Sequence, residues 1–152
     1  MKTEIVENTS AIWDELFLES NYIIADEMLK LFNAGKFDDL CIVLQKNKET
    51  QQRIAEVDLL FFMKEIMECI ILWKLSSIYR TDEQMARINK LRMDIKDSLD
   101  CEGCLSERNI KQYWKEAFDY AKDWAVARVK EAETIENLTW DEVFTQDYIY
   151  RG

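Results

Sequence analysis

The sequence predicts an all-α protein, and three features carry that prediction. The 152 residues include no proline and only three glycines, so the turns that a β-protein needs are scarce. Apolar residues make up 48% of the chain, which is enough for a core without disulfides or metal. These residues recur at helical spacings. We expect a single domain over residues 1–152, folded as one compact bundle of about five helices plus a short C-terminal helix.

The first helix is expected to begin at Thr9 or Ser10 and to end near Asn33. Gly35 follows in a position suited to the left-handed conformation that closes helices. One apolar stripe runs along the helix, formed by Trp13, Phe17, Ile24, Met28 and Leu31.

The second helix is expected to be short, from Phe37 or Asp38 to about Lys48. Thr50 then caps a long third helix that reaches about Tyr79. Apolar residues cover most of the circumference of this third helix, which places it in the middle of the bundle. Cys41 and Cys69 lie in apolar runs of these helices and are expected in the core.

The fourth helix has a clear start, because Thr81 and Gln84 fit a capping box. Its apolar stripe is Met85, Ile88, Leu91, Ile95 and Leu99, and the basic residues expected in solvent are Arg87, Lys90, Arg92 and Lys96. A fifth helix is expected from about Glu107 to Glu133. Its inner face is formed by Ile110, Trp114, Ala117, Ala121, Trp124 and Ala125. Thr139 and Glu142 form a second capping box, which starts a short helix over Trp140 to Gln146.

Charge and composition exclude several classes of function. The chain has no histidine, which removes Ser-His-Asp and Cys-His catalysis and the common zinc sites. The net charge of -10 is concentrated at the ends: residues 1–30 hold seven acidic and two basic side chains, and residues 131–152 hold six and one. Direct nucleic-acid binding is therefore not expected.

No membrane segment or secretory signal is expected. Residues 59–79 have the length of a membrane span but include Lys64, Glu65, Glu68 and Lys74. The N-terminus lacks the basic and apolar regions of a signal peptide, and free thiols suit the cytoplasm, where we expect the protein to be.

Four stretches and their order resemble a bacterial family of small helical proteins. They are ADEMLKLFNAGKFDDL (25–40), ILWKL (71–75), RINKLRMDIKDSL (87–99) and LTWDEVFTQDYI (138–149). The family is catalogued as the twenty-ninth domain of unknown function, and the similarity covers roughly residues 14–149. The resemblance implies a helical fold. It carries over no site residue, because the family has no established activity.

An acidic set on the third and fourth helices offers one enzymatic alternative. Glu65 and Glu68, followed by Asp94 and Asp97, are similar to the carboxylate pattern of the all-α nucleotide pyrophosphohydrolases of the MazG type. Carboxylates that converge in a bundle can hold magnesium against nucleotide phosphates. The simpler interpretation is a polar seam that is solvated or ion-paired.

The motif Cys101-Glu102-Gly103-Cys104 offers a second alternative. Two thiols at this spacing can hold zinc or form a redox disulfide. The simpler interpretation is a tight turn between helices, in which Gly103 supplies backbone freedom. We favour this interpretation and expect no cofactor.

Aromatic and acidic residues alternate near the C-terminus and form the candidate binding surface. They are Trp140, Asp141, Glu142, Phe144, Asp147, Tyr148 and Tyr150. Aromatic residues framed by acids suit contact with a protein partner that has a basic surface. The alternative is that the aromatic residues dock internally. The sequence thus favours a non-enzymatic protein that binds another macromolecule, of the kind found among inhibitors and immunity or anti-defence proteins of bacteria and phages.

Overall fold

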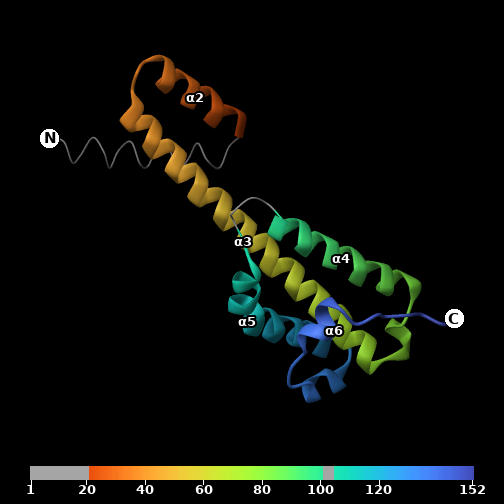
Figure 1. The fold of residues 1–152 in the computed structure, drawn as a ribbon. Helices are drawn as coiled ribbons and strands as arrows, with labels where there is room; N and C mark the ends of the chain where they lie inside the picture. Colours follow the sequence, from red (N-terminus) through yellow and green to blue (C-terminus); the bar gives the residue numbers. More distant parts are fainter. Residues whose placement is uncertain (1–20, 101–104) are drawn as a thin grey trace. The chain divides into compact units, whose positions relative to one another are not determined.

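The computed structural model describes residues 21–100 and 105–152, and all regular structure within them is helical. This confirms the all-α class. The expected start at Thr9 or Ser10, and the turn with Cys101 and Cys104, lie outside the described residues. The elements are α2 (Asn21–Asn33), α3 (Phe37–Leu75), the 3-10 helix η1 (Ser77–Tyr79), α4 (Asp82–Asp100), α5 (Glu107–Val126), the 3-10 helix η2 (Lys130–Thr134) and α6 (Trp140–Phe144) (Figure 1).

The chain divides into two compact units, residues 1–53 and residues 54–152. The single domain over residues 1–152 stays a prediction. Among the helices that the structure describes, none combines the length and the apolar character needed to cross a membrane.

In the first unit, α2 ends as the sequence predicts. Gly35 has a φ of 69°. The N–H of Lys36 donates to the carbonyl of Leu31 and the N–H of Gly35 to that of Phe32, both at 3.0 Å. These are the two bonds of a Schellman motif, which satisfies the last carbonyls of a helix. Ile24 and Val43 form the buried core of this unit, with Met28 and Leu31 packed against them.

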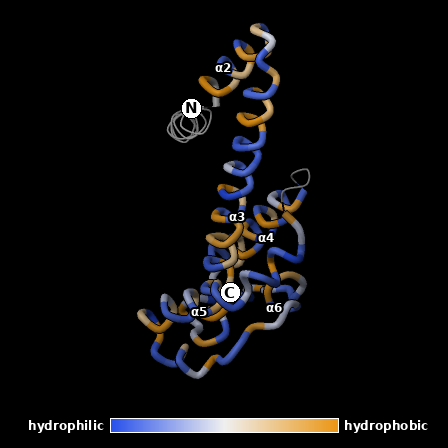
Figure 2. The backbone as a smooth tube through the Cα atoms, turned by 90° about the vertical axis from the view of Figure 1, so that its left-hand side faces the viewer, coloured by the Kyte–Doolittle hydropathy of each residue, from blue (hydrophilic) through white to orange (hydrophobic). Residues whose placement is uncertain are grey.

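The predicted break between a second and a third helix is wrong, because α3 runs without interruption from Phe37 to Leu75. The stretch around Thr50 contains no glycine or proline and is rich in Gln, Lys, Glu and Arg, which favour helix. Figure 2 shows this polar stretch as a mainly hydrophilic part of α3. The prediction that Cys41 lies in the core is also wrong: Cys41 is exposed, whereas Cys69 is buried.

In the second unit, the part of α3 from Leu59 onward supplies the central core, as expected for a helix that is apolar on most sides. Its fully buried residues are Leu59, Met63, Ile66, Met67, Ile70, Ile71 and Leu72. The helix ends at Leu75 and not at the predicted Tyr79. The Arg80 side chain donates to the carbonyls of Trp73 (2.9 Å) and Lys74 (3.2 Å). These carbonyls lie in the last turn of the helix, where no backbone N–H of the helix reaches them.

The apolar stripe of α4 is confirmed. Ile88, Leu91 and Ile95 are buried, and Met85 and Leu99 pack against the same core. The N–H of Gln84 donates to the Thr81 hydroxyl (3.1 Å), so Thr81 caps the helix. The prediction that Arg92 points into solvent is wrong, because its side chain is half-buried and binds carbonyls of the C-terminal part of the chain.

The fifth helix is shorter than predicted. It ends at Val126, and Val129 is extended, with a φ of -137°. The turn that follows brings Ala132 into the core, and this burial outweighs helix propensity. Ala117, Ala121 and Ala125 are fully buried as predicted, whereas Trp124 is 38% exposed and does not belong to the inner face. The remaining predicted inner-face residues are buried Ile110 and half-buried Trp114.

Candidate functional site

The C-terminal segment, residues 139–150, begins with the predicted capping box. The hydroxyl of Thr139 accepts from the N–H of Glu142 (3.2 Å), and the Glu142 carboxylate accepts from the N–H of Thr139 (2.7 Å). The helix α6 then ends at Phe144, two residues before the predicted end, and the N–H of Gln146 turns back to the carbonyl of Asp141 (2.7 Å). The segment therefore has a defined backbone geometry.

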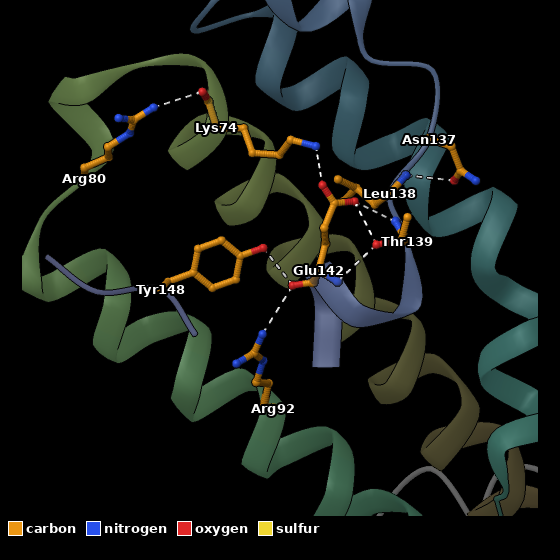
Figure 3. A network of polar contacts seen from close by, with 8 residues as sticks. All are labelled: Lys74, Arg80, Arg92, Asn137, Leu138, Thr139, Glu142 and Tyr148. Atoms are coloured by element: carbon orange, nitrogen blue, oxygen red, sulfur yellow. Dashed lines mark hydrogen bonds and ion pairs between the residues drawn. The ribbon is translucent and has the colours of Figure 1, made fainter. Parts of the chain in front are cut away.

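Arg92 joins this segment to α4, and Tyr148 adds a hydrogen bond within the segment (Figure 3). Arg92 of α4 donates to the carbonyls of Val143 (2.7 Å), Glu142 (3.2 Å) and Gln146 (2.8 Å). The Tyr148 hydroxyl also donates to the carbonyl of Glu142, at 2.8 Å. The guanidinium fork of Arg92 thus supplies donors to carbonyls at the end of α6, which a short helix leaves without partners.

The Glu142 carboxylate adds an ion pair to this arrangement. It binds the ammonium of Lys74 on α3 while it accepts from Thr139. Burial alone would raise the pKa of Glu142, but Lys74 and the Thr139 N–H outweigh burial and hold the pKa below its ordinary value. Glu142 is therefore charged at neutral pH. We call the contacts of Lys74, Arg92, Glu142 and Tyr148 the C-terminal anchor.

The aromatic residues of the segment also pack inward. Trp140 stacks on Trp114 of α5, with ring centroids 5.9 Å apart and an angle of 17°, and Phe144 lies 4.5 Å from Trp140. Tyr148 meets Trp73 edge to face at 5.7 Å and is only 6% exposed. Burial raises the pKa of Tyr148 to about 12. Among the predicted binding residues, the structure thus places Trp140, Phe144, Tyr148 and Glu142 in internal contacts.

The remaining predicted residues are not packed in the core, although the Asp141 carboxylate accepts from the Thr145 hydroxyl (2.9 Å) and Asp147 interacts electrostatically with Arg92. Asp141, Asp147 and Tyr150 are exposed, and Ile149 between the last two is exposed as well. Ile149 is a contact candidate that sequence reasoning missed, because that reasoning singled out only the aromatic and acidic residues around it. We call Asp141, Asp147, Ile149 and Tyr150 the outward face of the C-terminal segment.

A hollow of about 510 Å³ lies beside the stacked tryptophans. Lys111, Trp114, Lys115 and Trp140 line it together with Asn137. The Trp114 indole donates to the Asn137 side chain (3.3 Å), which in turn accepts from the N–H of Leu138 (2.9 Å). These bonds hold the wall of the hollow and link α5 to the start of the C-terminal segment.

The predicted acidic set is split between two places. Glu65 pairs with Arg87 (3.3 Å) and Glu68 with Arg128 (2.7 Å), whereas Asp94 pairs with Lys90 of its own helix (2.7 Å). Asp97 is exposed on α4. Within residues 21–100 and 105–152, no three Cys, Asp or Glu side chains are placed to hold a metal ion. The four carboxylates therefore do not form the converging set that the pyrophosphohydrolase pattern requires.

Glu65 and Glu68 instead line an open cleft of about 420 Å³. Its other walls are Phe61, Arg87, Trp124 and Arg128, and we call it the Glu68 cleft. Glu68 is 6% exposed. Burial raises the pKa of its carboxyl above the ordinary value, and Arg128 and Arg87 only partly oppose this effect.

The contact between Glu68 and Arg128 is an ion pair without a hydrogen bond. Oε1 of Glu68 lies 2.7 Å from Nη1 of Arg128, yet within the described part of the chain no donor points at this oxygen with hydrogen-bonding geometry. The sequence did not indicate Arg128 and Trp124 as wall residues. The fifth helix was expected to continue past Arg128 to Glu133 and to place Trp124 on its inner face. The neighbouring Cys69 is buried, which raises its thiol pKa to about 11 and disfavours the thiolate.

No family model, curated protein or solved structure matches the chain. The resemblance to the bacterial helical family therefore stays a prediction.

Proposed function

We propose that this chain is a non-enzymatic binding protein whose partner is a protein with a basic surface. The contact surface is the outward face of the C-terminal segment. One observation carries the proposal: the anchor holds the inner side of this segment while Asp141, Asp147, Ile149 and Tyr150 remain exposed. The same short segment thus has one side that is held by the anchor and one side whose side chains are exposed.

Such an arrangement favours binding for two physical reasons. A segment that is already ordered loses less conformational entropy when it associates. Tyrosine is a frequent hot-spot residue, and acids around it accelerate the approach of a basic partner. Residues 131–152 carry six acidic side chains against one basic side chain, so the charge of the chain end matches this role.

The magnesium-dependent alternative has less support. Shared magnesium ligands must approach the ion to roughly 2.0–2.1 Å. Glu65 and Glu68 lie against Arg87 and Arg128, and Asp94 lies against Lys90. The carboxylates are thus paired at separate places and do not surround one position for a shared ion, which leaves the binding function better supported.

Affinity purification from the native host, followed by mass spectrometry, tests the proposal. The test variant is Asp141→Asn/Asp147→Asn/Tyr150→Ala, which changes the outward face without placing a new positive charge near Arg92. The control is Asp119→Asn/Asp123→Asn, which makes the same charge change at exposed positions of α5. Deletion of residues 134–152 is unsuitable, because it would also remove Leu138, Val143 and Tyr148 from the core.

We expect a specific partner with a basic surface to be retained by the wild type and the control. Its recovery should fall about tenfold or more with the test variant, and it should decrease as salt is added. Equal recovery of all specific partners with the test variant and the wild type would contradict the proposal.

A further inference from the structure

The Glu68 cleft has no role in the proposed function, and its chemistry points to a ligand of its own. A buried carboxylate normally accepts hydrogen bonds, because an oxygen removed from water without a donor costs free energy. Among the residues that the structure describes, none gives Oε1 of Glu68 such a bond, although Arg128 lies 2.7 Å away. Glu68 lines an open cleft, although Oε1 itself is covered from solvent.

Arg128 is a replaceable partner for Glu68. It lies two residues beyond the end of α5, in a turn, and its side chain is 52% exposed. An exposed arginine keeps its own charge solvated when it moves into water, so the cost of its departure lies with the buried Glu68, and an incoming cation would offset that cost. Arg87, the second guanidinium of the cleft, is paired with Glu65. Departure of Arg128 would leave a buried carboxylate with a position for one cation.

The walls of the cleft favour a flat cation with several donors. Phe61 and Trp124 line it and are 49% and 38% exposed, so aromatic surface is available there. A guanidinium group binds a carboxylate through parallel hydrogen bonds and also lies well against aromatic faces. An ammonium group forms no such fork.

We propose that the Glu68 cleft binds a guanidinium group, which displaces Arg128 from Glu68 and lies against the aromatic walls formed by Phe61 and Trp124. The group can belong to a free guanidino compound or to an arginine side chain of a peptide. The cleft, of about 420 Å³, has room for the guanidinium group of either source.

An NMR titration of the ¹⁵N-labelled chain of 152 residues tests the proposal. The reporter is the indole N–H of Trp124, identified with Trp124→Phe. The probes are methylguanidinium, the peptide acetyl-Gly-Arg-Gly-amide, methylammonium and inorganic phosphate. The variants are Arg128→Ala, Arg128→Met, Glu68→Gln/Arg128→Ala and, as a matched control, Arg108→Ala, which removes another exposed arginine of the same unit.

We expect methylguanidinium to bind Arg128→Ala at least about tenfold more tightly than the wild type or Arg108→Ala, because the internal competitor is gone. Glu68→Gln/Arg128→Ala should not bind. Arg128→Met keeps the apolar stem and should behave like Arg128→Ala, so it serves if the alanine variant does not fold. Tighter binding of the peptide than of methylguanidinium supports a peptide source, and equal binding supports a free compound.

Three results would overturn the proposal. The first is the absence of a Trp124 shift with methylguanidinium in both folded Arg128 variants. The second is equal binding by Glu68→Gln/Arg128→Ala or equal binding of methylammonium, which would show a nonspecific cation effect. The third is a shift with phosphate alone, which would identify an anion site at Arg87 and Arg128. None of these results bears on the outward face, so the two proposals can fail separately.

Discussion

The C-terminal anchor and the Glu68 cleft each bring an arginine to acceptor oxygens, but they differ in how completely those oxygens are satisfied. At the anchor, Arg92 and Tyr148 donate hydrogen bonds of 2.7–3.2 Å to backbone carbonyls. At the cleft, Arg128 lies 2.7 Å from Glu68 without forming a hydrogen bond, and open space adjoins the pair. A complete network fixes structure, whereas an incomplete one retains capacity to bind.

The largest expected effect concerns the anchor. Arg92→Ala should lower the free energy of unfolding by about 2–4 kcal/mol, because it leaves carbonyls of Glu142, Val143 and Gln146 without their charged donor. Urea denaturation measures the loss. Arg92→Lys keeps the charge without the fork and should restore only part of the stability. A loss below about 0.5 kcal/mol for Arg92→Ala would show that the anchor does not hold the segment.

A smaller effect is expected at the cleft. Arg128→Ala should cost about 1–2 kcal/mol, since it leaves Glu68 unpaired, but the exposed position of Arg128 limits the loss. Adding Glu68→Gln should recover most of the loss by removing the buried charge. The same urea experiment on the four members of this double-mutant cycle gives the coupling. Additive losses would indicate that the ion pair carries no specific stabilisation.

The pH dependence of stability should have opposite signs at the two places. Burial opposes the charged form of Glu142, but Lys74 and Thr139 outweigh burial and lower its pKa in the folded state. Ionised Glu142 therefore adds to the free energy of unfolding above the unfolded pKa of about 4.5. This stabilisation is lost as pH falls through the folded pKa. Burial raises the pKa of Glu68 in the folded state. The protonated carboxyl group therefore adds to the free energy of unfolding, fully below about pH 4.5, and this stabilisation decreases as pH rises through the folded pKa.

Denaturation midpoints measured from acid to neutral pH check these signs. Glu142→Gln should reduce the loss of stability on the acid side. Glu68→Gln should reduce the decrease that accompanies rising pH. Identical pH slopes for the wild type and both variants would contradict the assigned environments of these carboxyl groups.

The smallest effects on stability are expected on the outward face. Tyr150→Ala should change the free energy of unfolding by no more than about 0.5 kcal/mol, because its side chain is exposed. Tyr148→Phe, two positions earlier, should cost about 1 kcal/mol through the lost hydrogen bond to the Glu142 carbonyl. Equal losses for the two variants would remove the distinction between the inner and outer sides of the segment.

Local signals in the sequence were sufficient for several features of the fold. Gly35 closes α2 as predicted, and Thr139 with Glu142 starts α6 as predicted, because both depend on residues only a few positions apart. The sequence did not reveal the contacts of Arg92 or Arg128, which join residues about 50 to 60 positions apart. Thr50 wrongly indicated a break between two helices. Capping residues also occur inside helices, and the neighbours of Thr50 favour helix strongly enough to keep α3 continuous.

The distinction between an inner and an outer side requires that the C-terminal segment be docked in solution. Native-state hydrogen exchange of the amides of Val143, Thr145 and Gln146, which donate to Thr139 and Asp141, tests this most directly. We predict protection in the wild type and its loss in Arg92→Ala, with the amide of Ile70 in α3 protected in both. Exchange of the segment amides in the wild type at the rate of an unstructured peptide would contradict the docked segment.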